Sequence, residues 1–234
     1  MYGAKPIPPM KPEAMSNPSI GTLKKSCPYE KGGEAMPNWC YTQYKIKGNS
    51  AEVVALYRTI EDLGQRKESL LPNGFGKLWL GNLVHVLGGD WEKIYCRGHI
   101  IDYEIHNGSL VISTETAWGE CSETRHFILE KYPSLEIYFQ SEEPGMCIFQ
   151  TNDASGDYFP DRWLLDWNDE AKNLYIYEYF LDLPAVIEYL KDFGVITTAI
   201  EPTKAAITAV LEEIQNSRPD DISWMLEEFV VVDD

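Results

Sequence analysis

The dipeptide Asn107-Gly108, which has an apolar, β-rich segment on each side, constrains the fold more than any other feature of this chain. Residues 99–105 precede the dipeptide and residues 110–118 follow it. Asn-Gly favours the two-residue turn in which both central residues have positive φ, and this turn joins antiparallel strands. The sequence therefore predicts a β-hairpin within an antiparallel sheet.

Segments on both sides of the hairpin have the spacing of helices and strands that would complete such a sheet. The expected elements are a strand at 39–47, a helix from Asn49 to Gly64, a short helix at 78–87, the hairpin, a helix at 121–132, a strand at 135–139 and a strand at 146–150. Glu52 is expected to complete a capping box with Asn49. Apart from the short helix and the last strand, the order is strand, helix, strand, strand, helix, strand. It predicts an α+β fold with a ferredoxin-like antiparallel sheet and helices on one face.

The C-terminal residues 154–234 are expected to form a mixed strand and helix extension packed on the same domain. Its expected elements are strands at 158–167 and 173–180 around Asn168-Asp169, a helix from Asp182 to Gly194, a helix at 201–215 and a final helical turn or two at 220–229. Residues 230–232 are either a last strand or an exposed apolar tail. Six prolines in residues 1–35 predict an extended leader, which leaves 36–153 as the ferredoxin-like domain.

The formal net charge is −17, and the acidic residues are concentrated towards the C-terminus. Residues 150–234 hold nineteen Asp and Glu residues against five Lys and Arg residues, whereas residues 1–36 hold five Lys residues and three acids. Such an acidic surface repels the phosphates of nucleic acids and membranes. We therefore expect no direct nucleic-acid or membrane partner. The acidic surface is either a docking site for a protein partner with a basic surface or an ordinary solvated face.

The acids expected to form this surface are Asp166, Asp169, Glu170, Glu178, Asp182, Glu188, Asp192, Glu212, Glu213, Asp220, Asp221, Glu227 and Glu228.

Motifs of enzymes and of metal sites are missing from the sequence. The five cysteines are scattered, with no CxxC and no Cys/His spacing typical of zinc ligands. No HExxH, GxSxG or P-loop pattern occurs. The N-terminus has no apolar stretch typical of a secretory signal, and no apolar run is long enough to cross a bilayer. We therefore expect a cytoplasmic protein without metal or cofactor, and a non-enzymatic role more than an enzymatic one.

Carboxylates near the hairpin are the weak candidates for catalysis. Glu115 lies in the strand after the turn, Glu120 follows that strand, and Glu142 and Glu143 cap the next strand. Two carboxylates that lie close together can act as acid and base or hold a divalent cation. The plainer interpretation is a solvated sheet face and a polar turn.

Aromatic residues are the other candidates for binding. Trp39, Trp91 and Trp118, together with Tyr41 and Tyr103, are expected to line an aromatic surface on the sheet. Sheets of this kind can stack aromatic side chains on nucleic-acid bases, although the ribonucleoprotein aromatic signature is missing and the local charge here is not basic. Core and edge packing is the alternative.

Three short motifs occur in order along the first part of the chain. They are residues 36–41 (MPNWCY) leading into a strand that Gly48 ends, residues 114–118 (TETAW) and residues 142–145 (EEPG). Their order and spacing resemble the YubB-type ferredoxin-like domain family. The resemblance covers roughly residues 36–153, and it implies a ferredoxin-like fold and an origin in a plasmid, phage or conjugative element. It implies no particular activity, because none is established for that family. The chain departs from the family where Trp91 precedes Lys93 and where Gly119-Glu120 follows Trp118.

These observations lead to three functional hypotheses. The first is a non-enzymatic interaction protein of a mobile genetic element, whose acidic surface docks on a basic nucleic-acid-handling or host-defence protein. The second is a small metal-dependent hydrolase that uses Glu115 with Glu142 or Glu143. The third is a structural homo-oligomer assembled through exposed sheet edges or through residues 230–232.

Overall fold

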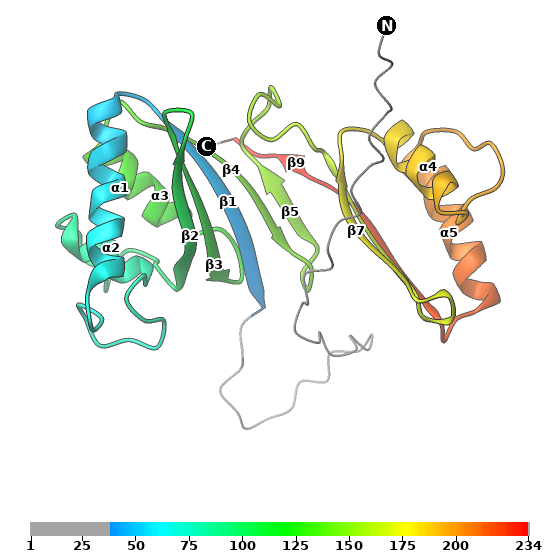
Figure 1. Ribbon diagram of the computed structural model, residues 1–234, viewed down its shortest axis with the longest axis horizontal. Helices are drawn as coiled ribbons and strands as arrows, with labels where there is room; N and C mark the ends of the chain where they lie inside the picture. Colours follow the sequence, from blue (N-terminus) through cyan, green and yellow to red (C-terminus); the bar gives the residue numbers. More distant parts are fainter. Residues whose placement is uncertain (1–37, 234) are drawn as a thin grey trace, which may run out of the picture. The chain divides into compact units, whose positions relative to one another are not determined.

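The computed structural model describes residues 38–233, which fold as α+β with two β-sheets (Figure 1). The expected leader at 1–35 and the predicted domain start at Met36 lie outside the described residues. No helix among residues 38–233 has the length and apolar character needed to cross a membrane.

A six-stranded sheet occupies the first part of the chain, with the strand order β2-β3-β1-β4-β5-β9. Its strands are β1 (Trp39–Lys47), β2 (Gly98–His106), β3 (Ser109–Ala117), β4 (Glu136–Glu143), β5 (Ile148–Thr151) and β9 (Val230–Val231). Neighbouring strands are antiparallel except for β9, which pairs in parallel with β5. The segment 230–232, which was expected to be either a strand or a tail, therefore contributes a short strand to this sheet.

The hairpin at Asn107-Gly108 is confirmed. Asn107 has φ of 50° and Gly108 has φ of 77°, as a turn with two positive φ angles requires. On either side of the turn, Ile105 pairs with Leu110 and His106 with Ser109. A bulge between Ile100 and Asp102 shifts the register farther along the hairpin.

Three helices cover one face of this sheet: α1 (Ser50–Gln65), α2 (Leu80–Val86) and α3 (Ser122–Lys131) (Figure 1). Along β1 the side chains alternate, so that Tyr44 and Ile46 are buried with Leu56 and Ile60 of α1. The opposite face of β1 carries Tyr41, Gln43 and Lys45, which are half-buried or exposed. We call this second face of the six-stranded sheet the helix-free face.

The capping box predicted at the start of α1 is wrong. Asn49 caps the helix by accepting a hydrogen bond from the backbone N–H of Ala51 at 2.8 Å. The carboxylate of Glu52 accepts instead from the backbone N–H and the hydroxyl of Ser134, at 3.1 and 2.7 Å. A contact distant in sequence therefore replaces the local one.

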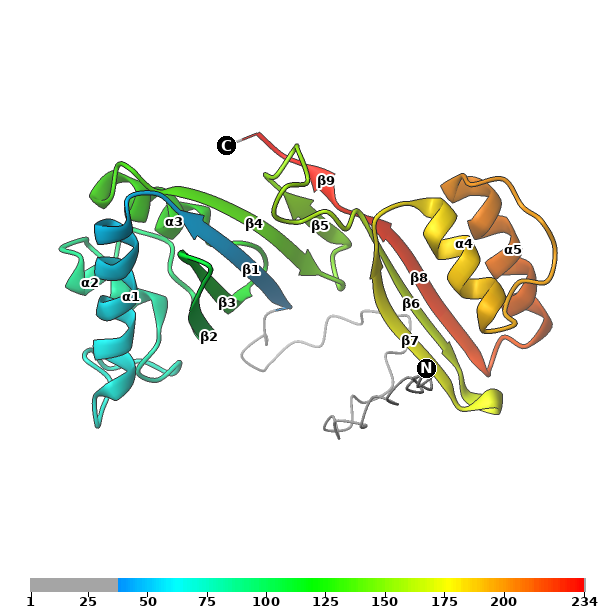
Figure 2. The same ribbon diagram turned by 45° about the horizontal axis from the view of Figure 1, so that its top comes forward.

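The second sheet has the order β7-β6-β8 and is antiparallel throughout. Its strands are β6 (Trp163–Asp169), β7 (Leu174–Phe180) and β8 (Ile222–Glu228). Helices α4 (Leu183–Asp192) and α5 (Lys204–Ser217) cover one of its faces (Figure 2). The core between them contains Trp167, Ile176, Val186, Leu190 and Leu211.

Two predictions in this region are wrong. Residues 222–228 form the strand β8 and not a helical turn, since each of them pairs with a residue of β6 in an antiparallel ladder. The turn between β6 and β7 is not at Asn168-Asp169. A short 3₁₀ helix, Glu170–Lys172, makes the turn and ends at Asn173, which has φ of 49°.

The two sheets belong to one compact unit and contact each other through a small apolar cluster. Phe149 of β5 packs with Leu164 of β6 and with Phe229, and the Phe149 and Phe229 rings lie 5.7 Å apart. The backbone N–H of Phe229 donates to the carbonyl of Arg162, and that of Val232 donates to the carbonyl of Thr151. The chain thus runs from β8 directly into β9.

Candidate functional site

Glu142, near the end of β4, is a buried carboxylate on the helix-free face of the six-stranded sheet. Only 9% of its surface is exposed. Two tyrosines of β7 donate hydrogen bonds to it, Tyr177 to Oε1 at 3.1 Å and Tyr179 to Oε2 at 3.0 Å. Tyr177 and Tyr179 lie on the same face of β7 because side chains two residues apart in a strand point the same way.

Burial and two tyrosine hydrogen bonds determine the pKa of the Glu142 carboxyl. Burial raises the pKa of the Glu142 carboxyl, and the two tyrosine hydrogen bonds oppose that rise. Among the described residues, no Lys, Arg or His forms an ion pair with Glu142. Burial and the neighbouring carboxylate raise the pKa of Tyr177 and Tyr179 as well.

A second carboxyl, Asp166 of β6, lies half-buried and pairs in register with Tyr177. Burial raises the pKa of Asp166. Burial is also the main cause of the raised pKa of Tyr177, and the charges of Glu142 and Asp166 add to it.

A pocket of about 280 Å³ opens beside Glu142. The residues that line it include Tyr41 and Gln43 of β1, Gln140 of β4, Asp161, Tyr179 and Phe229. The loop at 157–161 that closes one side is held in place by Asp153, whose carboxylate accepts hydrogen bonds from the backbone N–H groups of Tyr158 and Phe159. Gln140 donates to the carbonyl of Asp161 at 2.8 Å, which fixes the loop to the sheet.

Glu115, the expected partner of Glu142, does not reach it. Tyr41 pairs with Glu115 on one side and with Glu142 on the other, so that β1 lies between the two acids. Their Cα atoms are therefore about 10 Å apart, twice the spacing of neighbouring strands. The Oε2 atom of Glu115 lies 3.9 Å from Nε2 of His99 instead.

Glu143 and Glu120 face away from this pocket. Glu143 follows Glu142 in β4 and therefore points to the opposite face, where it accepts hydrogen bonds from the backbone N–H groups of Gly145 and Met146. Glu120 is buried and accepts from Tyr44 at 2.9 Å and from Arg125 at 3.2 Å. The four carboxylates thus occupy separate places.

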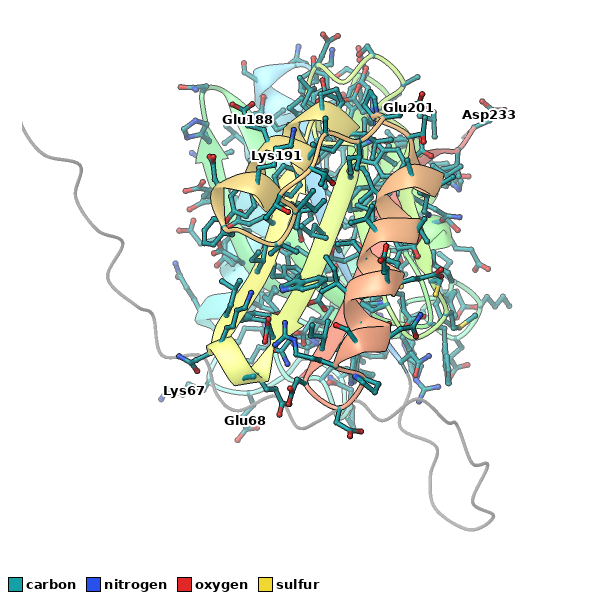
Figure 3. The ribbon with its side chains drawn as sticks, turned by 90° about the vertical axis from the view of Figure 1, so that its right-hand side faces the viewer. Lys67, Glu68, Glu188, Lys191, Glu201 and Asp233 are labelled. Carbon is teal, nitrogen blue, oxygen red and sulfur yellow. The ribbon has the colours of Figure 1, made fainter. Side chains whose placement is uncertain are left out.

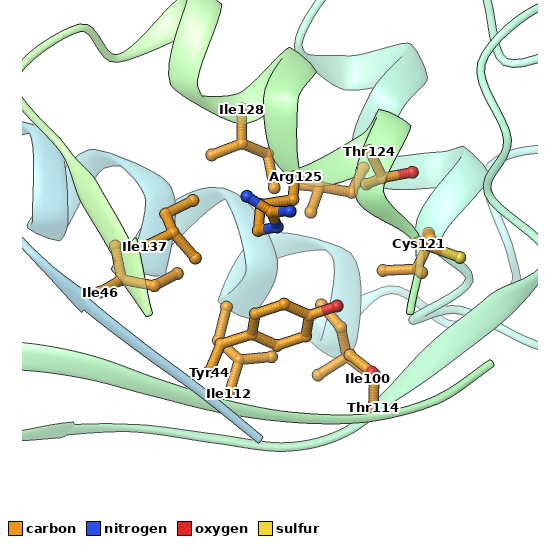
Figure 4. A pocket seen from close by; sticks show the side chains of 12 residues that line it. Tyr44, Ile46, Ile100, Ile112, Thr114, Cys121, Thr124, Arg125, Ile128 and Ile137 are labelled. Atoms are coloured by element: carbon orange, nitrogen blue, oxygen red, sulfur yellow. The ribbon is translucent and has the colours of Figure 1, made fainter. Parts of the chain in front are cut away.

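Figure 4 shows a cavity of about 30 Å³ between the sheet and α3, lined by Tyr44, Thr114, Cys121 and Arg125 among others. This volume is enough for a water molecule and too small for a substrate. Burial raises the pKa of the Cys121 thiol, so the residue is a poor nucleophile and packs as an apolar side chain.

Two of the three predicted binding tryptophans belong to one chain of aromatic contacts. Trp39 contacts Phe75, Phe75 stacks on Trp79, and Trp79 contacts Trp91, with ring centroids 5.3 to 6.5 Å apart. Trp118 makes no ring contact within the described part of the chain and is 41% exposed. Its φ of 70° is unusual for a bulky residue.

The predicted acidic residues of the C-terminal region are mostly at the surface. Glu212, Glu213, Asp220 and Glu228 are exposed, Asp221 and Glu227 are half-buried, and Glu227 pairs with Lys204 at 2.9 Å. Figure 3 looks onto α4 and α5 and labels Glu188 and Lys191 on α4 and Glu201 before α5. Asp169 is an exception to the predicted surface, because it is buried and bound by Arg218 through two hydrogen bonds.

Comparisons with protein-family models, with curated proteins and with solved structures gave no match. Function must therefore be inferred from the geometry. Within residues 38–233 no three His, Cys, Asp or Glu side chains converge on a point where they could hold a metal ion.

The sequence pointed to Glu142 but not to its partners. Tyr175, Tyr177 and Tyr179 alternate along β7, and this pattern indicates a tyrosine-lined strand face. Nothing local indicates what that face contacts, since Glu142 is 35 residues from Tyr177.

Proposed function

We propose that this chain is a non-enzymatic protein-interaction module whose acidic surface docks on a basic protein. The observation that carries the proposal is the exposure of four acids on the two helices of the second sheet: Glu188 and Asp192 on α4, and Glu212 and Glu213 on α5. Complementary charge speeds the encounter of two proteins and selects among partners. A nucleic-acid-handling or host-defence protein has the basic surface that would fit.

The test is capture of a partner at low and at high salt, followed by binding measurements with the purified partner. The variant replaces Glu188, Glu212 and Glu213 by Gln and Asp192 by Asn. The matched control neutralises four exposed acids elsewhere, Asp62, Glu68, Glu92 and Glu104, so that both variants have the same net charge.

We expect the captured partner to dissociate at high salt, because the Debye length falls from about 10 Å at 0.1 M to about 3 Å at 1 M. We expect the α4/α5 variant to lose binding and the control to keep it. Salt-insensitive capture, equal losses in both variants, or the lack of any partner would refute the proposal.

The ferredoxin-like assignment of the first domain is also a proposal. It is supported by the order β2-β3-β1-β4, by antiparallel pairing across all four strands, and by the helices α1 after β1 and α3 after β3. In this assignment α2, β5 and β9 are additions. The YubB-type resemblance, the origin in a mobile genetic element and the cytoplasmic location stay predictions.

Self-association is a second candidate function, favoured by the edge strand β2. Among the described residues, β3 is the one strand that pairs with it, and its other edge forms an isolated bridge between His99 and Trp79. Ile101 and Ile105 are 43% and 42% exposed. Exposed apolar edges are sites of strand pairing between molecules. Sedimentation of the wild type against an Ile101→Lys, Ile105→Lys variant tests this; a monomeric wild type would exclude it. No comparable support exists for the hydrolase hypothesis, because Glu115, Glu142 and Glu143 do not converge.

A further inference from the structure

The buried carboxylate of Glu142 is the feature of the pocket that indicates a positively charged ligand. Charged groups are rarely buried in proteins without an oppositely charged partner. No Lys, Arg or His of the described residues forms an ion pair with Glu142. Lys47 pairs instead with Glu136 at 3.0 Å and lies over the Tyr138 and Tyr158 rings, and Arg162 donates to the carbonyl of Asp153. Within the described residues the counter-charge is therefore not supplied by the chain itself.

The position of the carboxylate is fixed before any ligand arrives. Each of its oxygens accepts one tyrosine hydroxyl, from Tyr177 or Tyr179. A carboxylate has room for about four hydrogen bonds, so each oxygen keeps capacity for one more donor. Two free acceptor positions on one plane match a donor with two parallel N–H groups.

The walls of the pocket favour an organic cation with a flat face. Tyr41, Tyr179 and Phe229 supply aromatic surface, and Gln43 and Asp161 supply polar groups at its margin. A cation placed over an aromatic ring is attracted by the ring's negative face, most strongly where water is excluded. At about 280 Å³ the pocket lies just below the range of about 300 to 1,000 Å³ that is usual for small-molecule sites, so it suits one side chain.

We propose that this pocket receives the guanidinium group of an arginine side chain presented by a protein partner. The guanidinium would bind the two oxygens of Glu142 through parallel N–H groups and lie against the aromatic walls. This inference rests on the proposed docking of a basic protein and names the group that would be recognised.

Two other cations fit the pocket less well. A lysine ammonium is a compact point charge that cannot bind both oxygens in one plane. A divalent metal ion takes six or more oxygen ligands, or four ligands in the case of zinc, and Glu142 and Asp161 are the only carboxylates among the described residues that line the pocket.

The experiment titrates the full chain with three short peptides that differ at one position, which is arginine, lysine or citrulline. Citrulline keeps the shape of arginine without its charge. Binding is measured by calorimetry and by NMR shifts of the tyrosine rings. The variant is Glu142→Gln, and the control is Glu115→Gln, which removes an exposed carboxylate from the same face of the sheet.

We expect the arginine peptide to bind roughly tenfold or more tightly than the citrulline peptide, and more tightly than the lysine peptide. Glu142→Gln should abolish this preference, and Glu115→Gln should keep it. Lowering the pH should weaken binding as Glu142 takes up a proton. The other titratable groups that line the pocket are Tyr41, Tyr158, Asp161 and Tyr179, and Tyr177 donates to Glu142. If Glu142→Gln fails to fold, Asp161→Asn, which should weaken binding, replaces it.

Equal binding of the arginine and citrulline peptides, an unchanged preference in Glu142→Gln, or binding of free arginine as tight as that of the peptide would overturn the inference. Its failure is distinguishable from failure of the proposed function. A partner whose binding depends on the acids of α4 and α5 but not on Glu142 refutes only the arginine pocket. Arginine-peptide binding without any such partner supports the pocket and refutes the docking surface.

Discussion

The hydroxyl of Tyr179 donates a hydrogen bond to Oε2 of Glu142 at 3.0 Å, and this contact joins the three-stranded sheet to the six-stranded one. One sheet supplies the charge and the other supplies the donors. Since Glu142 is buried, the contribution of each donor to stability should be measurable.

Replacing Tyr179 by Phe removes the hydroxyl that donates to Glu142, so that Oε2 of this buried carboxylate loses its hydrogen bond. We expect the free energy of unfolding to fall by about 1 to 3 kcal/mol, the usual cost for a hydrogen bond to a charged group. Urea denaturation at neutral pH measures it. Tyr175→Phe is the matched control: Tyr175 lies on the same face of β7, is 60% exposed, and its hydroxyl makes no hydrogen bond within the described residues. Equal losses in both variants would contradict a specific role for Tyr179.

Glu142→Gln should change how stability depends on pH. Burial raises the pKa of Glu142 in the folded state above its value of about 4.3 in the unfolded chain. Between these two values the folded state binds more protons, so this group lowers stability as the pH rises. Gln does not titrate. The stability of the variant relative to wild type should therefore increase from about pH 4.3 towards neutrality, as measured by urea denaturation at several pH values. A constant difference over that range would be inconsistent with a raised pKa.

The elements of the first sheet were predictable because their signals are local. The Asn107-Gly108 turn depends on the φ preferences of two adjacent residues. The strand Trp39–Lys47 and the buried side of α1 were predictable from the regular spacing of their apolar residues. Strand β8 was missed because its two buried residues, Ile222 and Leu226, are four positions apart, a spacing that fits a helix as well as a strand.

The contacts of the candidate site were not predictable in the same way. The partners of Glu142 are set by how β7 packs against the first sheet, and no periodicity within one segment records such a contact. Asp169 shows the same limit: its sequence neighbourhood is acidic and polar, but tertiary packing buries it against Arg218, 49 residues away.

Gly108→Ala tests whether the hairpin turn needs glycine. Gly108 has φ of 77°, and a Cβ there would meet no atom within 4 Å, so that any loss comes from backbone strain and not from a clash. We expect a loss of about 1 to 2 kcal/mol in the free energy of unfolding. Gly119→Ala is the control, because that glycine is also without neighbours within 4 Å but has no left-handed φ. It should be neutral or slightly stabilising, since alanine restricts the unfolded chain. A neutral Gly108→Ala would mean that the turn tolerates a side chain.

Arg218→Met tests the buried ion pair of the second sheet. The guanidinium of Arg218 donates to both oxygens of Asp169, at 2.8 and 2.6 Å, and the main effect of these bonds is to hold the pKa of Asp169 below its ordinary value. Without Arg218, the buried carboxylate keeps the backbone N–H of Lys172 and the Lys172 ammonium at 3.8 Å but loses its two closest donors. We expect the melting temperature at neutral pH to fall by several degrees.

The pH dependence of this loss has a defined sign. A carboxyl with a lowered pKa stabilises the fold above its unfolded value of about 3.9, and this stabilisation is lost as the pH falls towards the lowered pKa. The difference between wild type and Arg218→Met should therefore be largest near neutrality and shrink below about pH 4. Lys204→Met, which removes the more exposed pair with Glu227, is the control and should change the melting temperature little. A loss in Arg218→Met that is no larger than in Lys204→Met would show that the buried pair adds nothing beyond a surface contact.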